Sequence, residues 1–220
     1  MKTRLFYAIL VAAGICLQGC TNSYAKDRGE AKENSAGERL EISFRFQRGG
    51  IASSQYAIWI EDETGRLVRT LYATSFTAEG GYEYRKDALP VWVSKAKPQA
   101  LSSAQIDAIT GATPRSGMAT YQWDGTDDKG NRVPTGTYTF FIEGTLYWKS
   151  RVIYSGILDW GGKEQDSISI KVQRFHPSQT NEHMITELTY IIHSGFISGY
   201  QNRYGDNLKP PTNVYHRMTA

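Results

Sequence analysis

Hydrophobic residues recur at every second position in several stretches of this 220-residue chain, and this period constrains its fold more than any other feature. In "LEISFRFQ", apolar side chains alternate with polar ones, as in a half-buried β-strand. The apolar positions there are Leu40, Ile42, Phe44 and Phe46. The next stretch, "QYAIWIEDETGRLVRTLYAT", predicts a hairpin that turns at "DETG", with Gly65 where a positive φ is favoured.

Three more stretches have strand character. They are the segment around Tyr121 and Trp123, then "GTYTFFIEGTLYW", and then "SISIKVQRF". Turn-forming residues dominate between them, above all from Asp124 to Gly136. Short strands joined by turns predict an all-β, immunoglobulin-like β-sandwich over residues 40–175.

One part of the predicted sandwich does not have the two-residue period. In "ALPVWVSKAKPQALSSAQIDAI", Pro90 stands where helices begin, and Pro98 interrupts any single long helix. Ser102 or Ser103 can cap a further helical turn. We therefore expect a short helical insertion of one or two helices, preceded by a loop from Glu79 to Lys86.

The N-terminus has the pattern of an export signal. Two basic residues precede a 13-residue apolar run, Leu5 to Leu17, which is too short to span a membrane as a helix. The following "LQGC" resembles the lipobox of bacterial lipoproteins, in which the cysteine becomes the first mature residue and carries acyl chains. The resemblance implies a signal peptide over residues 1–19 and lipid attachment at Cys20. Because Thr21 is not aspartate, it also implies the outer membrane, facing the periplasm or the cell surface.

Composition characterises the segments on either side of the predicted sandwich and the cysteine content of the mature domain. Residues 20–39 are polar and charged, which predicts a flexible tether. The only other cysteine, Cys16, lies in the signal, so the mature domain has no thiol for a disulfide or for catalysis. Residues 176–220 form an extension of uncertain structure, in which "MITELTYIIHS" is compatible with a strand or an amphipathic helix.

Several classes of function find no support in the sequence. The net charge of +3 is spread along the chain, whereas nucleic-acid binding needs a clustered basic face. There is no nucleophile motif, P-loop or dinucleotide fingerprint, and the histidines lack metal-site spacing. We therefore expect no catalytic residues, no metal site and no enzymatic activity.

The segment "WDGTDDKGNRVPTGTYTF" resembles the signature of hook-capping-type immunoglobulin-like domains. Asp124 and Asp127 can bond backbone amides, Gly130 and Gly136 can supply positive φ, and Pro134 can fix a bend. A calcium loop is the alternative, but an EF-hand requires acids and a glycine at positions that this segment does not match. A structural turn is the favoured interpretation.

A wider set of segments, in order, resembles the predicted periplasmic family called domain of unknown function 2271. They are "ISFRFQ", "YAIWIEDETGRLVRTLY", "LPVWVSKA", "DAITGATPRSG", "YQWDGTDDKGNRVPTGTY" and "FIEGT". The resemblance covers roughly Leu40 to Val172. It implies an exported β-rich domain without an established enzymatic activity, found beside membrane-bound redox or iron-reduction systems.

Within that set, "DAITGAT" also resembles the acceptor motif of proteins that are covalently flavinylated outside the cytoplasm. The matching residues are Asp107, Thr110, Gly111, Ala112 and Thr113. In those proteins an FAD:protein FMN transferase joins FMN to the last threonine through a phosphodiester bond. The resemblance therefore implies that the Thr113 hydroxyl is the acceptor. The alternative is a tight connector, in which these residues serve only the turn.

Two functions remain open. The first is an envelope-anchored, non-catalytic binding or scaffold lipoprotein, accessory to a periplasmic redox or iron-reduction system. The second is an extracytoplasmic electron-transfer protein with covalent FMN, whose partners would be an FMN transferase and a membrane redox protein. Glycan binding through the aromatic residues near Tyr147 and Trp148 is a third, weaker alternative.

Overall fold

The computed structural model describes residues 37–49, 54–111, 114–147, 149–162, 168–177, 183–193 and 216–217. The predicted signal peptide, the lipidated Cys20 and most of the predicted tether lie outside these residues. No helix in these ranges is long and apolar enough to cross a membrane.

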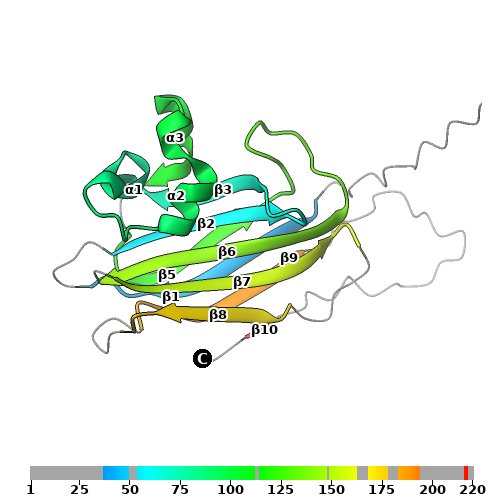
Figure 1. Ribbon diagram of the computed structural model, residues 1–220. Coiled ribbons are helices and arrows are strands. Elements are labelled where there is room, and N and C mark those ends of the chain that lie inside the picture. Colours follow the sequence, from blue (N-terminus) through cyan, green and yellow to red (C-terminus); the bar gives the residue numbers. More distant parts are fainter. Residues whose placement is uncertain are drawn as a thin grey trace, which may run out of the picture. The chain divides into compact units, whose positions relative to one another are not determined.

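Two β-sheets pack face to face, and a group of short helices covers part of one of them (Figure 1). The smaller sheet contains, in spatial order, β10 (His216–Arg217), β9 (Ile185–His193), β1 (Arg39–Phe46) and β5 (Gly117–Trp123). The larger sheet contains β4 (Thr110–Gly111), β3 (Leu67–Thr74), β2 (Gln55–Asp62), β6 (Gly136–Tyr147), β7 (Ser150–Trp160) and β8 (Ile170–Phe175). All neighbours are antiparallel except β3 and β4, which run parallel. The predicted β-sandwich is confirmed.

The strand order is that of an immunoglobulin-like sandwich. The pairs β1–β5, β2–β3, β2–β6 and β6–β7 correspond to strands B–E, C–C′, C–F and F–G of that fold. Strand β9 pairs with β1 on the side where strand A stands in immunoglobulin domains. The Tyr138 hydroxyl donates to the Pro134 carbonyl at 2.9 Å, which is the tyrosine corner at the start of strand F.

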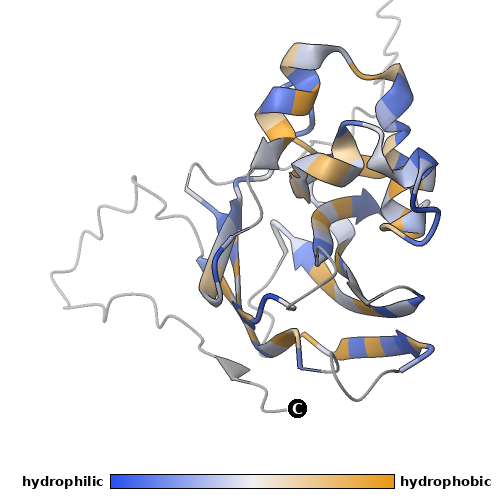
Figure 2. Ribbon diagram, turned by 90° about the vertical axis from the view of Figure 1, so that its left-hand side faces the viewer, coloured by the Kyte–Doolittle hydropathy of each residue, from blue (hydrophilic) through white to orange (hydrophobic). Residues whose placement is uncertain are grey.

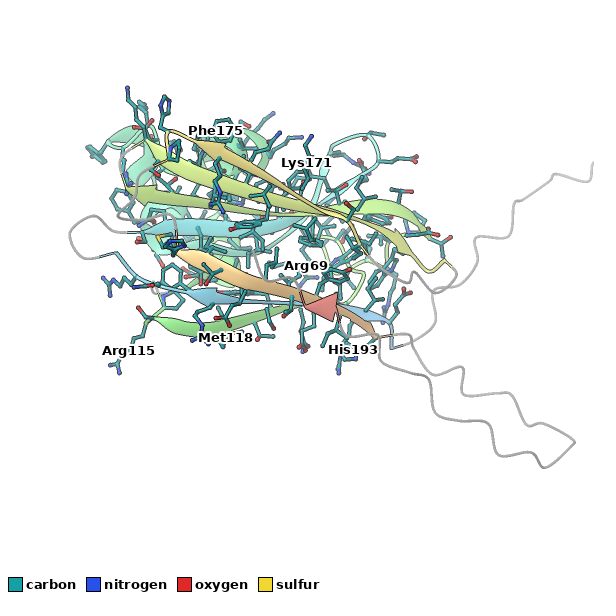
Figure 3. All side chains as sticks on the ribbon, turned by 90° about the horizontal axis from the view of Figure 1, so that it is seen from below. Arg69, Arg115, Met118, Lys171, Phe175 and His193 are labelled. Atoms are coloured by element: carbon teal, nitrogen blue, oxygen red, sulfur yellow. The ribbon has the colours of Figure 1, made fainter. Side chains whose placement is uncertain are left out.

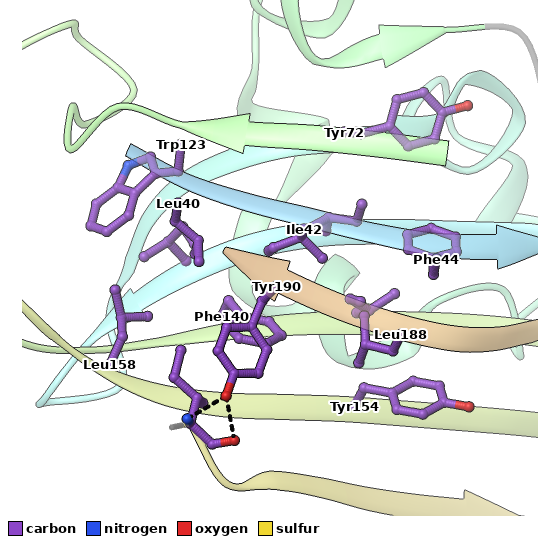
Figure 4. Close-up of a cluster of buried hydrophobic side chains, with 14 of the residues drawn as sticks. Leu40, Ile42, Phe44, Tyr72, Trp123, Phe140, Tyr154, Leu158, Leu188 and Tyr190 are labelled. Carbon is purple, nitrogen blue, oxygen red and sulfur yellow. Dashed lines mark hydrogen bonds between the residues drawn. The ribbon is translucent and has the colours of Figure 1, made fainter. Parts of the chain in front are cut away.

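The space between the sheets is filled by the side chains that the two-residue period predicts (Figure 4). From β1, the residues Leu40, Ile42, Phe44 and Phe46 are all fully buried. They meet residues of the facing sheet such as Phe140 from β6. At about 25 cal/mol per Å² of apolar surface removed from water, this layer is the main stabilising contribution to the fold.

The helical insertion lies between β3 and β5. It consists of α1 (Ser75–Ala78), η1 (Gly81–Glu83), α2 (Pro90–Ala96), η2 (Pro98–Ala100) and α3 (Ser103–Ile109), where η marks a 3₁₀ turn. The predicted helix start at Pro90 and the interruption at Pro98 are confirmed. The segment from Ala88 to Ile109 contains two short α-helices, α2 and α3, as predicted. Helix α1 lies before this segment and was not predicted, and the loop predicted for residues 79–86 contains η1.

A second apolar layer joins the helices to the outer face of the larger sheet. Trp59 of β2 points away from the sandwich core and stacks on Phe141 of β6, with ring centroids 5.1 Å apart and ring planes 11° apart. Trp92 of α2 is fully buried in the same layer. Strand β2 is therefore buried on both faces. The hydropathy colours alternate along the strands and are mixed on the helices (Figure 2).

The sandwich extends past residue 175, the end that the sequence predicts. Strand β9 forms from "ITELTYIIH", so this segment is a strand and not an amphipathic helix. It pairs along nearly the whole length of β1, from Arg39↔His193 to Phe46↔Ile185. Strand β9 also contributes Tyr190, whose hydroxyl bonds both the amide and the carbonyl of Ile168.

Candidate functional site

The described part of the "DAITGAT" segment lies at the surface. Asp107 is exposed on α3, a helix that has no buried residue. Ser102 begins this helix with a capping box, since it accepts from the Gln105 amide while the Gln105 side chain accepts from the Ser102 amide. The prediction of a serine cap is thereby confirmed. Figure 1 shows α3 on the side of the helical layer away from the sheets.

After α3, Thr110 and Gly111 form strand β4, which adds to the edge of the larger sheet. Thr110 pairs with Ala73 and Gly111 with Thr74, in parallel. The predicted residues Ala112 and Thr113 lie outside the described residues. The structure therefore places Thr110 and Gly111 beside the end of β3, with Asp107 on the helix that precedes them, and describes the chain again from Pro114.

Two side chains hold the Gly111 carbonyl. The Ser75 hydroxyl donates to it at 2.9 Å, and the Tyr72 hydroxyl at 3.2 Å. A Cβ atom on Gly111 would lie 3.1 Å from Cε2 of the Tyr72 ring, tighter than most real contacts. A side chain at this position would therefore press on the Tyr72 ring, whereas the φ angle of Gly111 is not a positive one that favours glycine.

Tyr72 belongs to a cluster of three tyrosines beneath this segment. Its ring centroid lies 4.9 Å from that of Tyr56 and 5.1 Å from that of Tyr121. The hydroxyls of Tyr56 and Tyr121 are hydrogen-bonded at 2.6 Å. Burial raises the pKa of Tyr72 to about 12 and also raises the pKa values of Tyr56 and Tyr121. All three phenols are therefore neutral at physiological pH and act as packing groups and hydrogen-bond donors.

The segment crosses from one sheet to the other. It leaves β4 of the larger sheet at Gly111, and by Gly117 the chain has entered β5 of the smaller sheet. The Ser116 hydroxyl oxygen accepts from the Arg48 amide at 3.0 Å, which ties this crossing to the end of β1. The candidate site is therefore the crossing at the β3–β5 edge of the sandwich, above the tyrosine cluster.

The crossing and the point where the chain enters the domain lie at opposite ends of the sandwich. Strand β1 starts at Arg39, with Leu40 opposite Trp123, and ends at Phe46 opposite Gly117. An antiparallel strand of eight residues spans about 25 Å. Figure 3 shows Arg115 and Met118 at one end of the molecule and His193, which pairs with Arg39, toward the other.

At the entry end lies a groove of about 680 Å³ between the β2–β3 turn and the loop before β6. Among the lining residues, Arg66, Lys129 and Arg132 are exposed cations. The Asp62 carboxylate accepts from the Thr64 and Arg66 amides, so its oxygens are already engaged within the turn.

The loop from Trp123 to Tyr138 has the structural role that its pattern predicts. Asp124 accepts from the Thr126 amide, and Asp127 accepts from the Lys129 and Asn131 amides at 2.9 and 2.8 Å. Gly130 has a φ of 80°, as expected. Gly136 has a positive φ too, 157°, as predicted.

One charged residue of the helical layer was not identified from the sequence. Glu143 of β6 is completely buried, and its carboxylate accepts from the Val91 and Trp92 amides at 3.3 and 2.8 Å, at the first turn of α2. Arg151 lies 3.4 Å away. Burial raises the pKa of Glu143 to about 7, although the Trp92 amide and the Arg151 charge oppose the shift. The only available signal was a lone acid inside the apolar run "TFFIEGT".

Within the described ranges, no three His, Cys, Asp or Glu side chains are placed to hold a metal ion together. The sequence analysis also missed Tyr72 and Ser75. Neither is recognisable from its local pattern, because they lie 39 and 36 residues before Gly111.

Comparison with known proteins gives a family and no individual relative. No curated protein and no solved structure matches the chain. A family model described as "Predicted periplasmic protein (DUF2271)" matches residues 38–175. These residues run from the entry into β1 to the end of β8, and they include the helical insertion and the crossing. The chain therefore belongs to the DUF2271 family of predicted periplasmic proteins.

Proposed function

We propose that this protein is a non-catalytic carrier of the bacterial envelope that holds FMN covalently on Thr113 and transfers electrons between partner proteins. One observation carries the proposal. Asp107 is exposed on α3, and Thr110 and Gly111 are half-buried in a two-residue edge strand, with Gly111 held from beneath. A connector has only to join two sheets, whereas an acceptor must be accessible to a second enzyme.

The residues around the crossing are compatible with a flavin. Two large hydrophobic side chains are exposed in the segments that flank it: Phe76 (43%) in α1, which contacts β4, and Met118 (55%) in β5. They offer apolar surface to a planar aromatic ring. FMN, when bound, supplies one- and two-electron redox chemistry.

The role of the chain's own residues in attachment is limited. The Thr113 hydroxyl would attack the phosphorus of the FMN half of FAD, the pyrophosphate bond would break, and AMP would leave. The hydroxyl proton would pass to a base of the transferase. Asp107 is exposed two helical residues before the end of α3, where it can contact the transferase.

The membrane anchor belongs to the same proposal. A lipid on Cys20 would hold the chain through residues that enter the sandwich at Arg39, at the end opposite the crossing. The crossing is then left free for partners in the periplasm or at the cell surface. Replacing Cys20 with Ser should release the protein from the outer-membrane fraction. Persistent membrane association of this variant would show that the anchor assignment is wrong.

Intact mass tests the flavin assignment. The full chain is exported together with an FMN transferase, and we expect it to gain the mass of one FMN and the flavin absorption bands. Thr113→Ala should abolish both. Thr137→Ala is the matched control, since it removes an exposed threonine hydroxyl from β6, and it should be labelled like the wild type. A colourless wild-type protein, beside a control substrate that the same transferase labels, would eliminate the flavin function.

The groove at the entry end favours a second candidate, a binding or scaffold module for a membrane redox protein. In that case Thr113→Ala would leave the activity of the redox system unchanged. Charge reversal of Lys129 and Arg132 at the rim of the groove would instead reduce it. The two variants therefore separate the two functions.

A further inference from the structure

The two sheets have four margins, and an uncovered strand edge invites pairing with another chain. At one margin of the larger sheet, β3 pairs with β4 at one end. At its other end, Asp128 donates its amide to the Val68 carbonyl and accepts from the Thr70 amide through its side chain. In the smaller sheet, β9 pairs with β10 and is bent by a bulge, where Glu187 has a φ of 51°. These two margins are therefore covered or distorted.

The margin at β8 is protected by charge. Among the described residues, β8 pairs only with β7, and it exposes both Lys171 and Arg174. Arg174 stands opposite Val152, a core residue, so it places a charge on the inner side of the sheet. Two copies of β8 would bring like charges together, and inward-pointing charges are a means by which edge strands avoid pairing.

The margin at β5 has no such protection. The strand, "GMATYQW", contains neither a charged residue nor a proline. Within the described ranges, its backbone is hydrogen-bonded to β1 alone. An immunoglobulin sheet continues past strand E, the counterpart of β5, with strand D, and no described strand takes that place here. Figure 3, in which the smaller sheet lies in front, shows Met118 of β5 at the outer margin of that sheet.

The core is incompletely covered at this edge. The core-facing residues of β1 are fully buried, whereas Ala119 and Tyr121 of β5 pack against the same core and remain partly exposed. On the opposite face of β5, Met118 is 55% exposed. A further strand would cover this apolar surface and pair with the backbone groups that point away from β1. The smaller sheet is therefore one strand short at β5.

We propose that β5 is the dimer interface of this protein and pairs antiparallel with β5 of a second copy, with Thr120 opposite Thr120 on the two-fold axis. This register places Met118 of one copy opposite Gln122 of the other. On the neighbouring β1, Arg45 stands beside Met118, and Glu41 stands beside Gln122. A basic residue of one copy thus shares a row with an acidic residue of the other, whereas a parallel arrangement would align like charges.

The symmetry also limits the assembly. A two-fold pair uses the same edge of both copies, so the unprotected edge of each copy is consumed. The β8 margins that remain at the two ends of the joined molecule carry Lys171 and Arg174. The assembly therefore ends at a dimer and does not grow into a fibre. This interface does not depend on whether Thr113 carries a flavin.

A cysteine at the two-fold axis tests the pairing. Directly opposite residues of an antiparallel pair have Cα atoms about 4.5–5.5 Å apart, a separation that a disulfide spans. The chain's own cysteines are Cys16, in the predicted signal, and Cys20, at the predicted lipid site, so the wild type should form no disulfide. Full-length Thr120→Cys protein, oxidised in its own envelope, should migrate at twice the monomer mass and return to the monomer mass on reduction.

Ser43→Cys is the matched control. Ser43 stands opposite Thr120 on β1, and their hydroxyls share one hydrogen bond of 2.8 Å, so both variants lose the same contact. Across the proposed interface, however, the two Ser43 residues lie three strand spacings apart, about 14 Å, which is too far for a disulfide. Gln173→Cys tests the β8 margin in the same way. Both controls should remain monomeric.

A lysine at the same position gives a readout without a disulfide. Thr120→Lys places two like charges directly opposite each other, which destabilises a strand pair. In sedimentation of the full chain in detergent, the wild type should have the protein mass of a dimer and this variant half of that mass. Gln173→Lys adds the same charge to β8 and should remain a dimer. Far-ultraviolet circular dichroism checks that both variants are folded.

Two results would overturn the proposal. The first is a Thr120→Cys protein that stays monomeric under oxidising conditions. If its thiol is then shielded from maleimide in the envelope but reactive after purification, a different protein covers the edge, and the second copy is excluded. The second is equal cross-linking of Thr120→Cys, Ser43→Cys and Gln173→Cys, which would indicate random collision in place of a defined pairing.

Discussion

Replacing Glu143 with Gln should make the domain more stable at alkaline pH. This carboxylate is completely buried between β6 and α2, and its pKa is raised to about 7 from an ordinary value of 4.5. Burial is the main cause, and the amides of Trp92 and Val91 and the charge of Arg151 offset only part of it. Glutamine has nearly the shape of the protonated acid and does not ionise.

Proton linkage gives the sign and the size of the change in folding stability with pH. Between pH 4.5 and 7 the folded protein keeps a proton on Glu143 that the unfolded chain has lost. Its contribution to stability is therefore fully present below pH 4.5 and is lost as the pH rises to about 7. Between pH 5 and 8 the loss is about 2–3 kcal/mol, which corresponds to a decrease in melting temperature of roughly 5–10 °C for a chain of this size.

Chemical denaturation at pH 5, 6, 7 and 8 measures this difference. The free energy of unfolding of Glu143→Gln should agree with that of the wild type at pH 5, within about 1 kcal/mol for the changed acceptor. At pH 8 the variant should be the more stable protein by about 2 kcal/mol. Glu63→Gln is the control, because it removes one negative charge from the exposed β2–β3 turn and should keep the wild-type profile.

A Glu143→Gln protein that keeps the full wild-type dependence on pH would refute the reasoning. So would a variant that is less stable than the wild type at every pH by the same amount. In that case the carboxylate is ionised throughout, and the two amides and Arg151 outweigh its burial. Comparing variant with wild type cancels the contributions of the other titrating groups.

Two further predictions concern packing. In urea denaturation, Gly125→Ala should cost at least twice as much free energy of unfolding as Gly130→Ala. Both residues have a positive φ, 75° and 80°, and an alanine in this conformation costs about 1–2 kcal/mol. Only at Gly125 would the added Cβ also lie 2.4 Å from the Trp160 ring, so equal costs would contradict this contact. Trp92→Ala should lower the free energy of unfolding by about 3–5 kcal/mol, because it leaves a cavity in the apolar layer between α2 and the sheet. A decrease below about 1 kcal/mol in the same assay would contradict the burial of Trp92.

The strands of the sandwich were predictable because their signal is local. Each strand buries one face in the central core, so its sequence shows the two-residue period directly, as at Leu40 and Ile42 of β1. Helix α2 and the cap at Ser102 were predictable for a similar reason, since proline and serine act on the backbone next to them. Gly65, with a φ of 76°, is another local requirement.

The second layer was not predictable in this way. Trp59 and Ala57 of β2 fall between the core positions of the strand, where the pattern leads one to expect polar residues facing water. They are buried because a helical insertion elsewhere in the chain covers them. The pairing of β9 with β1 depends likewise on contacts between residues about 150 positions apart, such as Arg39 and His193. Periodicity shows that a face is buried, but not which element covers it.

The same limit explains why "DAITGAT" was open to two interpretations. A short pattern of Gly, Ala and Thr is compatible with a connector and with an acceptor, because both need a slim backbone. The difference lies in residues that the pattern does not contain. Tyr72 and Ser75 hold the Gly111 carbonyl from 39 and 36 residues upstream, and the solvated helix before it carries Asp107. A connector needs these contacts only for the stability of the crossing, whereas the proposed acceptor also needs a crossing that a second enzyme can reach. The functional distinction is therefore a property of the folded crossing.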